Sequence, residues 1–195
     1  MNTDFIKGVV VPMITPIDKD ELIDEAAIRS QVDYVIDGGV SGILLFGSNG
    51  EFYVVEEDEM ERGLKIVVDQ AAGRVPVYFG IGAISTKKCV RLAKMAVANG
   101  AASVSVLQPM FLKPTETELF THFKAIADAI PETPVLLYNN PGRVGYTLSA
   151  NLVERLAHEV PNIVGMKDTS GDITQTSEFI RRNRDVDFKV FGGKD

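Results

Sequence analysis

The sequence predicts an α/β fold built as a (β/α)8 barrel, the TIM barrel. Short apolar runs alternate with amphipathic stretches at a repeat of roughly 30 residues, which is the size of one strand and one helix with their connections. The apolar runs are continuous, which is typical of parallel strands covered by helices. Polar and glycine-rich residues follow almost every run, and the active sites of barrels collect at these strand ends.

Seven apolar runs predict the strands. They are Gly8–Met13, Gly42–Phe46, Val75–Gly80, Ser103–Leu107, Val135–Tyr138, Ile163–Lys167 and Phe188–Phe191. An open doubly wound sheet would favour a glycine-rich loop after the first strand, to cradle a dinucleotide. The sequence has Pro12-Met13-Ile14-Thr15-Pro16 at that place, which cannot hold a pyrophosphate. The closed barrel is therefore favoured over the open sheet.

Six amphipathic stretches with helical spacing predict the helices. They are Asp24–Asp37, Glu56–Ala72, Thr86–Asn99, Thr115–Ile130, Ser149–His158 and Ile173–Asn183. Short polar side chains at a helix start can accept hydrogen bonds from the free N–H groups of the first turn. The expected N-caps are Asp24, Thr86, Thr115 and Ser149. Gly38-Gly39 and Asn99-Gly100 are expected helix stops.

A closed barrel of this kind needs eight strands, and the sequence supplies seven. Gly192-Gly193-Lys194-Asp195 comes just after the seventh. We therefore expect a TIM barrel truncated after strand seven. Residues 1–195 would form a single, incomplete domain in which strand eight and any C-terminal helical segment are absent.

Composition and charge exclude several classes of function. The net charge is −7, and no run of lysine and arginine stands out, so nucleic acid is not an expected partner. No apolar stretch has the length of a membrane span, and the N-terminus does not resemble a signal peptide, so we expect a cytoplasmic protein. Cys89 is the single cysteine, which excludes an intrachain disulfide and a cysteine metal cluster. His122 and His158 are expected to be surface or helix-packing residues.

Lys167 is the strongest candidate for chemistry. It ends the apolar run that begins at Ile163, so a barrel would direct its side chain into the mouth where catalytic residues lie. Desolvation at such a position favours the neutral amine, which can attack a carbonyl carbon. The alternative is a strand-end lysine that reaches solvent or pairs with Asp168.

Tyr138 and Arg143 strengthen this interpretation. Tyr138 ends the preceding strand, and a phenol beside a reactive lysine can relay protons. Its alternative role is to cap the barrel core with its hydroxyl in water. Arg143 follows in the next loop and offers a planar fork for a carboxylate. Its alternative role is a salt bridge within the loop.

The segment Gly47-Ser48-Asn49-Gly50-Glu51 follows the second strand. Consecutive backbone N–H groups with short polar side chains can form a nest for an anion. The carboxylate of a 2-oxo acid would fit such a nest. The alternative is an ordinary turn between a strand and a helix, and the segment alone does not decide between the two.

Together, these segments resemble the pyruvate-dependent class I aldolases and lyases, the dihydrodipicolinate synthase / N-acetylneuraminate lyase family. Five motifs carry the resemblance in the right order and spacing. They are the first strand in Gly8–Pro16, the Gly-Ser/Thr-Thr-Gly-Glu loop in Gly47–Glu51, the Tyr-Asn-x-Pro motif in Tyr138–Pro141, the Schiff-base segment in Gly165–Gly171 and the Gly-x-Asp turn in Gly192–Asp195. The resemblance runs through the whole chain.

The resemblance implies a lyase or aldolase that forms a Schiff base between Lys167 and pyruvate, with Tyr138 as the proton relay. Gly47, Ser48 and Asn49 would hold the pyruvate carboxylate. Arg143 would hold the carboxylate of a second substrate, which favours a synthase-like member that condenses pyruvate with aspartate semialdehyde. The resemblance further implies no metal or organic cofactor, small molecules as partners, and a homo-oligomer, either a dimer or a tetramer.

Two residues depart from the pattern of the synthases. Asn49 stands where the family loop usually has threonine, and Phe111 stands where these synthases have a tyrosine that extends the relay. Phe111 can relay no proton, so the identity of the second substrate does not follow. The alternatives are an aldolase that cleaves N-acetylneuraminate or a 2-keto-3-deoxy sugar acid, and a non-catalytic relative that binds a 2-oxo acid.

Overall fold

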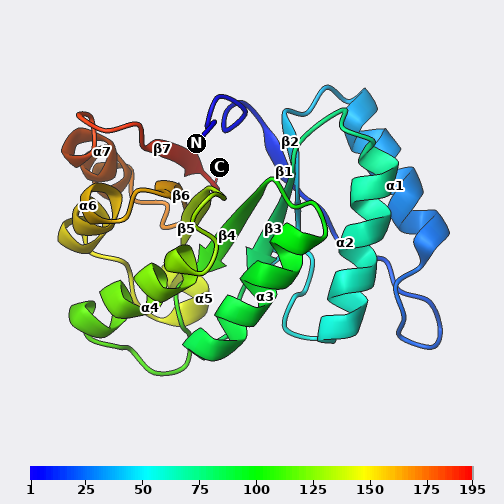
Figure 1. The fold of residues 1–195 in the computed structure, drawn as a ribbon, viewed down its shortest axis with the longest axis horizontal. Helices are drawn as coiled ribbons and strands as arrows, with labels where there is room; N and C mark the ends of the chain where they lie inside the picture. Colours follow the sequence, from blue (N-terminus) through cyan, green and yellow to red (C-terminus); the bar gives the residue numbers. More distant parts are fainter. Residues whose placement is uncertain (195) are drawn as a thin grey trace.

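The computed structural model describes residues 1–194, whose strands form one parallel sheet in chain order (Figure 1). The strands are β1 (Val10–Pro12), β2 (Gly42–Leu45), β3 (Val77–Ile81), β4 (Ser103–Leu107), β5 (Val135–Asn139), β6 (Ile163–Asp168) and β7 (Lys189–Gly192). Each strand pairs with its neighbours in the sequence. The seven predicted strands are confirmed, and the barrel fold is present as a curved half-barrel.

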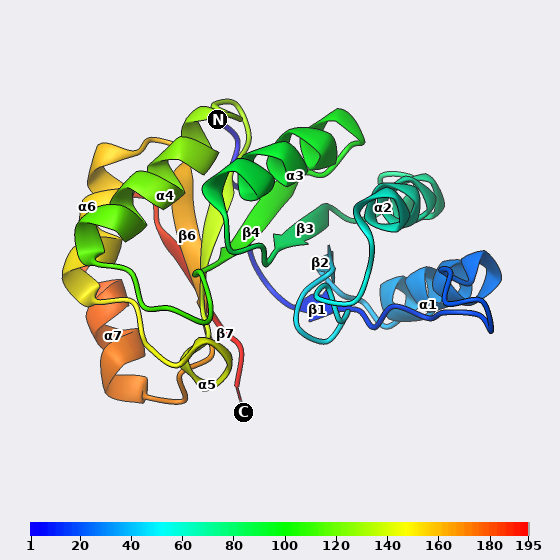
Figure 2. The same ribbon diagram turned by 90° about the horizontal axis from the view of Figure 1, so that it is seen from below.

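Helices cover the outer side of this sheet. They are α1 (Glu25–Asp37), α2 (Glu57–Ala71), α3 (Thr86–Ala98), α4 (Glu116–Asp128), α5 (Pro141–Val144), α6 (Ala150–Glu159) and α7 (Ile173–Arg182). Figure 2 shows the six long helices along the outside of the arc that the strands make. These six correspond to the predicted stretches, whereas the short helix α5 was expected to be a loop.

Three of the four predicted N-caps are confirmed. The side chains of Asp24, Thr115 and Ser149 each accept a hydrogen bond from the first turn of their helix. The prediction for α3 was wrong by one residue, because Ser85 is the cap and its hydroxyl accepts from the Lys88 N–H at 3.3 Å. Thr86 already belongs to the helix, and its hydroxyl contacts a histidine instead.

Two apolar clusters hold the fold together. The larger one lies between the sheet and the helices. The smaller one fills the inside of the half-barrel and contains Ile6, Leu44, Tyr78, Leu136 and Val164. Because alternate strand residues face opposite sides, β2, β3, β5 and β6 each contribute an inward-facing residue to this cluster.

The N-terminal segment, residues 1–8, closes the inner cluster at the amino ends of the strands. The Tyr78 hydroxyl donates to the carbonyl of Phe5 at 3.3 Å, and Ile6 packs inside the cluster. The Thr3 hydroxyl donates to Asp187 Oδ2 at 2.6 Å, just before β7. Figure 1 shows the N-terminus close to β7, so this segment crosses from the β7 side of the sheet to β1.

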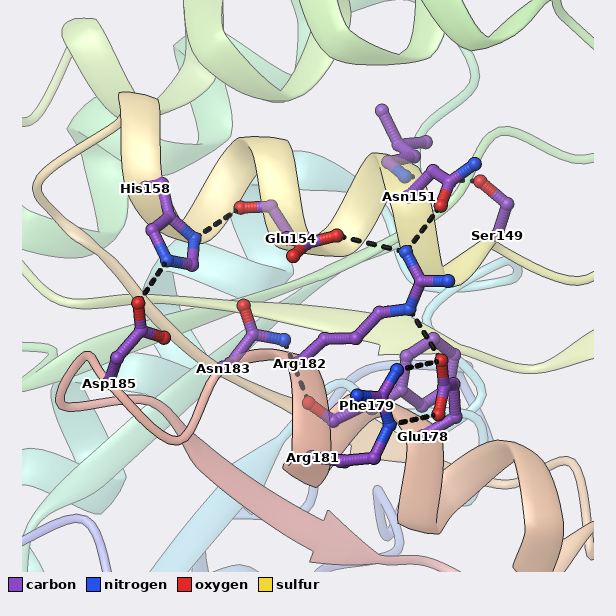
Figure 3. A network of polar contacts seen from close by, with 11 residues as sticks. Ser149, Asn151, Glu154, His158, Glu178, Phe179, Arg181, Arg182, Asn183 and Asp185 are labelled. Carbon is purple, nitrogen blue, oxygen red and sulfur yellow. Dashed lines mark hydrogen bonds and ion pairs between the residues drawn. The ribbon is translucent and has the colours of Figure 1, made fainter.

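A polar network ties α6 to α7 and to the turn that follows α7 (Figure 3). Arg182 Nη1 donates to Glu154 Oε2 at 2.9 Å, and its Nε donates to Glu178 Oε1 at 2.6 Å. His158 places Nδ1 2.8 Å from the Glu154 carbonyl and Nε2 3.2 Å from Asp185 Oδ2. Both ring nitrogens face acceptors, so the protonated ring fits best, and the Glu154 carbonyl followed by Asp185 raises the pKa of His158.

His122 packs α4 against α3, as the sequence predicted for a helix-packing histidine. The ring is buried, and Nδ1 lies 2.8 Å from the hydroxyl of Thr86. Within residues 1–194, Nε2 has no hydrogen-bond partner. Burial lowers the pKa of His122 to about 4, so the ring is neutral in the folded protein at neutral pH.

Two features are absent from the residues that the structure describes. No helix in residues 1–194 has both the length and the apolar character that a membrane span requires. The same residues contain no group of three or more histidine, cysteine, aspartate or glutamate side chains placed to hold a metal ion.

Candidate active site

The pairing of β5 with β6 brings Tyr138 and Lys167 side by side. They are direct partners in the strand register, and both lie near the carboxyl ends of their strands. The Lys167 amine lies over the phenol ring, with Nζ 4.8 Å from the ring centroid. A lysine over the face of an aromatic ring interacts favourably with it. The register alone therefore brings the two strongest candidates from the sequence into contact.

The Tyr138 hydroxyl contacts two polar side chains, Ser48 and Asn140, which lie in two different loops. The side chain is 5% exposed, so its hydroxyl is largely shielded from solvent. Its oxygen lies 3.3 Å from Ser48 Oγ, in the loop after β2, and accepts a hydrogen bond from Asn140 Nδ2 at 2.8 Å. The loop after β2 and the loop after β5 thus converge on one phenol oxygen.

The loop after β2 is a tight turn with two strained residues. Phe46 and Glu51 have φ values of 52° and 51°, in the left-handed region that side chains other than glycine adopt rarely. The Gly50 N–H donates to the Gly47 carbonyl, and the Thr15 hydroxyl donates to the Gly50 carbonyl at 2.7 Å. These bonds fix the turn that carries Ser48.

The anion nest expected in this loop stays a prediction. Gly47 is buried, Ser48 is half-buried and Asn49 is exposed. Within residues 1–194, the backbone N–H groups of Ser48 and Asn49 donate to no other atom. Free N–H groups in a turn are what a carboxylate would bind, so this geometry is compatible with the predicted role.

Gly193 packs closely against the side chain of Lys167. A Cβ atom at this position would lie 2.5 Å from Lys167 Cε and 2.7 Å from Thr169 Cγ2, closer than atoms pack. A glycine after β7 therefore leaves the room that the lysine stem occupies. Of the Gly192-Gly193 pair, Gly193 therefore packs directly against Lys167.

A cavity of about 210 Å³ lies inside the half-barrel beside Lys167. Its lining is mainly apolar and includes Leu44, Tyr78 and Leu136. Tyr138 and Ser48 do not line it, so Lys167 is the residue shared by the cavity and the polar group around the phenol. Lys167 therefore faces the apolar cavity in one direction and the polar group around the Tyr138 hydroxyl in the other.

Arg143 is the predicted site residue that the structure joins least closely to the others. It lies exposed on α5, directly after the loop that carries Asn140. No ion pair to Arg143 occurs within residues 1–194, so the alternative of a loop salt bridge is not observed there. Phe111, which replaces the relay tyrosine, is 90% exposed after β4 and has a φ of 81°.

Sequence reasoning missed a chain of buried polar side chains behind the site. Gln108, Asn139 and Asp168 follow or end three neighbouring strands and face away from the barrel interior. Gln108 Nε2 donates to Asn139 Oδ1 at 3.3 Å, and Asn139 Nδ2 donates to Asp168 Oδ1 at 2.9 Å. Asp168 accepts from neutral groups, including the Thr176 hydroxyl at 2.5 Å, and forms no ion pair with Lys167 within residues 1–194.

A signal for this chain was present in the sequence. Residues alternate between the two faces of a strand, so the residue after an inward-facing Tyr138 or Lys167 faces outward. A polar residue at that place, beneath covering helices, must find hydrogen-bond partners there. Asn139 and Asp168 are direct partners in the register of β5 and β6, which is why they meet.

A parallel half-barrel with a lysine and a tyrosine in contact at neighbouring strand ends places this chain among the TIM-barrel proteins with a strand-end lysine. The model of the Dihydrodipicolinate synthetase family matches residues 5–195. The chain therefore belongs to that family.

Curated relatives and solved structures agree with this assignment. The 4-hydroxy-tetrahydrodipicolinate synthase of Salinibacter ruber is 39% identical over 189 residues, which cover 97% of this chain and 62% of the relative. A dihydrodipicolinate synthase from Acinetobacter baumannii, solved in complex with pyruvate, has a TM-score of 0.92 and 36% identity, over 96% of this chain and 64% of that one. The enzyme from Aquifex aeolicus has a TM-score of 0.90 and 32% identity, over 95% of this chain and 62% of that one. The chain thus spans less than two thirds of the length of these relatives.

Proposed function

We propose that this chain carries the catalytic lysine of a pyruvate-dependent Schiff-base lyase of the dihydrodipicolinate synthase type. One observation supports the proposal most directly. Lys167 lies over the ring of Tyr138, whose hydroxyl also contacts Ser48 and Asn140. An amine that must add to a carbonyl, and a hydroxyl that can give or take a proton beside it, are the groups that imine formation needs.

The proposed reaction begins with attack of neutral Lys167 Nζ on the C2 carbonyl of pyruvate. The carbinolamine that forms takes a proton on its oxygen and loses one water, which leaves the protonated imine. Transfer of a C3 proton from this imine to water gives the neutral enamine, whose C3 can add to an aldehyde. In this scheme Tyr138 relays the proton to the carbinolamine oxygen, and the Ser48 and Asn49 amides hold the pyruvate carboxylate, with Gly47 shaping the turn.

For the second substrate, we propose aspartate semialdehyde. The similarity to the 4-hydroxy-tetrahydrodipicolinate synthase of Salinibacter ruber supports this choice. Arg143 would bind the carboxylate of the aldehyde, since a guanidinium can hold a carboxylate through two parallel hydrogen bonds. Its exposed position beside Asn140 and its lack of an ion pair within the described residues leave the guanidinium free for that role.

A homo-oligomer is part of the same proposal. Ile84, Phe111 and Leu112 are large apolar side chains that are mostly exposed and line one depression of the surface. Exposed apolar groups that gather in this way often mark a protein interface, and a second copy of the chain is the partner we propose. The cytoplasmic location stays a prediction.

The lysine is tested by trapping the imine. The full chain is incubated with pyruvate and borohydride, and peptide mass spectrometry locates the mass of reduced pyruvate. We expect the label on Lys167, and none in Lys167→Ala or Lys167→Arg, because a guanidinium supplies no neutral amine. Lys194→Ala is the matched control and should be labelled as the wild type is. A label that persists in Lys167→Ala would refute the assignment.

The second substrate is tested with a coupled assay. Turnover of pyruvate with aspartate semialdehyde is the expected result. Cleavage of N-acetylneuraminate or a 2-keto-3-deoxy sugar acid in its place would identify an aldolase. Imine formation without any turnover would identify the non-catalytic relative that binds a 2-oxo acid.

A further inference from the structure

Asn140 occupies an unusual position for an asparagine at the start of a helix. It is the N-cap residue of α5 and is 8% exposed. Asparagine is among the best N-cap residues because its side-chain oxygen accepts a hydrogen bond from the first turn. The Asn140 side chain makes no such bond. Its amide instead donates to the Tyr138 hydroxyl at 2.8 Å.

The backbone of Asn140 is held firmly on both sides. Its N–H donates to Oε1 of the buried Gln108 at 3.1 Å. Its carbonyl accepts from the N–H groups of Arg143 and Val144, both at 3.1 Å. Gln108 also donates to the Tyr146 carbonyl at 2.8 Å, so one side chain bridges both ends of the α5 segment. These hydrogen bonds fix the backbone of Asn140, and its side-chain amide is therefore held in the orientation that contacts the Tyr138 hydroxyl.

We propose that Asn140 is a positioning residue that directs the proton of the Tyr138 hydroxyl. A phenol oxygen can donate one hydrogen bond and can also accept. The Asn140 side-chain N–H donates to the phenol oxygen, so the hydroxyl proton must point to the other side of that oxygen. Ser48 Oγ lies 3.3 Å from the Tyr138 hydroxyl oxygen and can accept that proton. This inference rests on the proposed role of Tyr138 as the relay.

The same hydrogen bond acts after the proton has left. A phenolate is a charged acceptor, and hydrogen bonds to charged groups are shorter and stronger than those between neutral groups. The Asn140 amide therefore stabilises the deprotonated relay more than the protonated one. Phe111 has no hydroxyl to offer, so within residues 1–194 the polar partners of the phenol oxygen are Ser48 and Asn140, while the Lys167 amine lies over the ring.

Two variants separate this role from helix capping. Asn140→Asp has nearly the same shape and is an equally good N-cap residue, but it has no N–H to donate. Asn140→Gly is also tolerated at an N-cap, and it removes the donor without adding a charge. Ser149→Asp is the matched control, because it makes the same kind of change at the N-cap of α6, away from the phenol.

The measurement is the exchange of pyruvate methyl protons with deuterated water, followed by proton NMR. This half-reaction needs only pyruvate, the imine and proton transfer. In both Asn140 variants we expect exchange to slow by about ten- to a hundredfold, the usual effect of losing a hydrogen bond to a charged group. The rise of the exchange rate with pH should also move to higher pH. The final yield of borohydride trapping after long incubation with saturating pyruvate should match the wild type, because that yield does not depend on how fast the imine forms. The melting temperature of Asn140→Gly should also match the wild type, as should every measurement on Ser149→Asp.

The outcomes distinguish this inference from the proposed function. If the wild-type chain traps no pyruvate, the proposed function fails first. If the wild type traps pyruvate but both Asn140 variants exchange at the wild-type rate, the hydrogen bond from Asn140 to Tyr138 has no part in proton transfer. A parallel loss of trapping and exchange, with no change in the pH profile, would show that Asn140 maintains the shape of the site and does not direct the proton.

Discussion

At the scale of single residues, Tyr138 is the point where three parts of the chain meet. Ser48 comes from the loop after β2, Asn140 from the loop after β5, and Lys167 from the end of β6. The Tyr138 hydroxyl therefore keeps these contacts only if the ends of β2, β5 and β6 keep their relative positions in the sheet. Gly193, after β7, adds a fourth segment by packing on the lysine stem.

The variant Tyr138→Phe isolates the hydroxyl. The ring and its contact with Lys167 remain, so the melting temperature should change little. If the phenol relays protons, turnover should fall by about 10²–10⁴-fold, the usual contribution of a positioned acid–base group. Steady-state kinetics and thermal unfolding of the same preparation measure both quantities. Unchanged turnover would exclude the relay.

The variant Arg143→Ala tests recognition of the second substrate. Its loss should raise the KM for a carboxylate-bearing aldehyde by about ten- to a hundredfold, since one charge-assisted pair is lost. Exchange of the pyruvate methyl protons should not change, because that step does not involve the aldehyde. Arg155→Ala, on the outer surface of α6, is the matched control. Equal damage to both half-reactions would instead mean that Arg143 is structural or binds pyruvate itself.

At the scale of elements, the alternation of apolar runs with amphipathic stretches was enough to predict the strands and the long helices. The Ser103–Leu107 strand and the start of β6 at Ile163 were predicted to the residue. The helix α5 was not predicted, because it has only four residues, beginning with Pro141, and so short a segment carries no periodic pattern. The Ser85 cap was missed because Ser85 and Thr86 are equally good caps in isolation, and only the contact of Thr86 with His122 separates them.

The candidate site divides in the same way. The meeting of Lys167, Tyr138 and Ser48 could be predicted, because all three lie at the ends of strands that face the barrel mouth, whereas their catalytic roles stay a prediction. The roles of Asn140 and Gln108 could not, because they depend on which partner a buried amide reaches. That partner is set by the register of neighbouring strands and by the path of the α5 segment.

The packing of α3 against α4 should depend on pH through His122. The pKa of His122 is lowered to about 4 in the folded protein, from an ordinary value of 6.5. Between these values the unfolded chain binds a proton that the folded chain does not, so stability falls as the pH drops from 6.5 to 4. The full difference corresponds to about 3 kcal/mol.

The measurement is urea unfolding of the wild type and of His122→Gln across this pH range. The variant should lose less stability on acidification, because it has no imidazole to protonate. His158 has the opposite effect, since its raised pKa adds stability as the pH falls, but it is present in both proteins and cancels in the comparison. Parallel curves for the two proteins would show that His122 does not account for the pH dependence.

At the scale of the whole molecule, the N-terminal segment determines how well the inside of the half-barrel is filled. Ile6 is 2% exposed and packs with residues from four strands. Ile6→Ala should lower the free energy of unfolding by about 2–5 kcal/mol, as removal of buried methyl groups from a packed core usually does. Val9→Ala is the control, because Val9 is 64% exposed, and its effect should be small. Urea unfolding of both variants measures the difference, and equal effects would mean that Ile6 does not fill the core.

The contact between Thr3 and Asp187 also affects the order in which the chain folds during synthesis. The two residues are 184 positions apart, so the contact cannot form until the segment that holds Asp187 has been synthesised. Loops this long close slowly, and contacts between distant residues delay folding. During synthesis the inner apolar cluster therefore stays incomplete until β6, which supplies Val164, has emerged. A chaperone that binds apolar segments has its longest opportunity before that point.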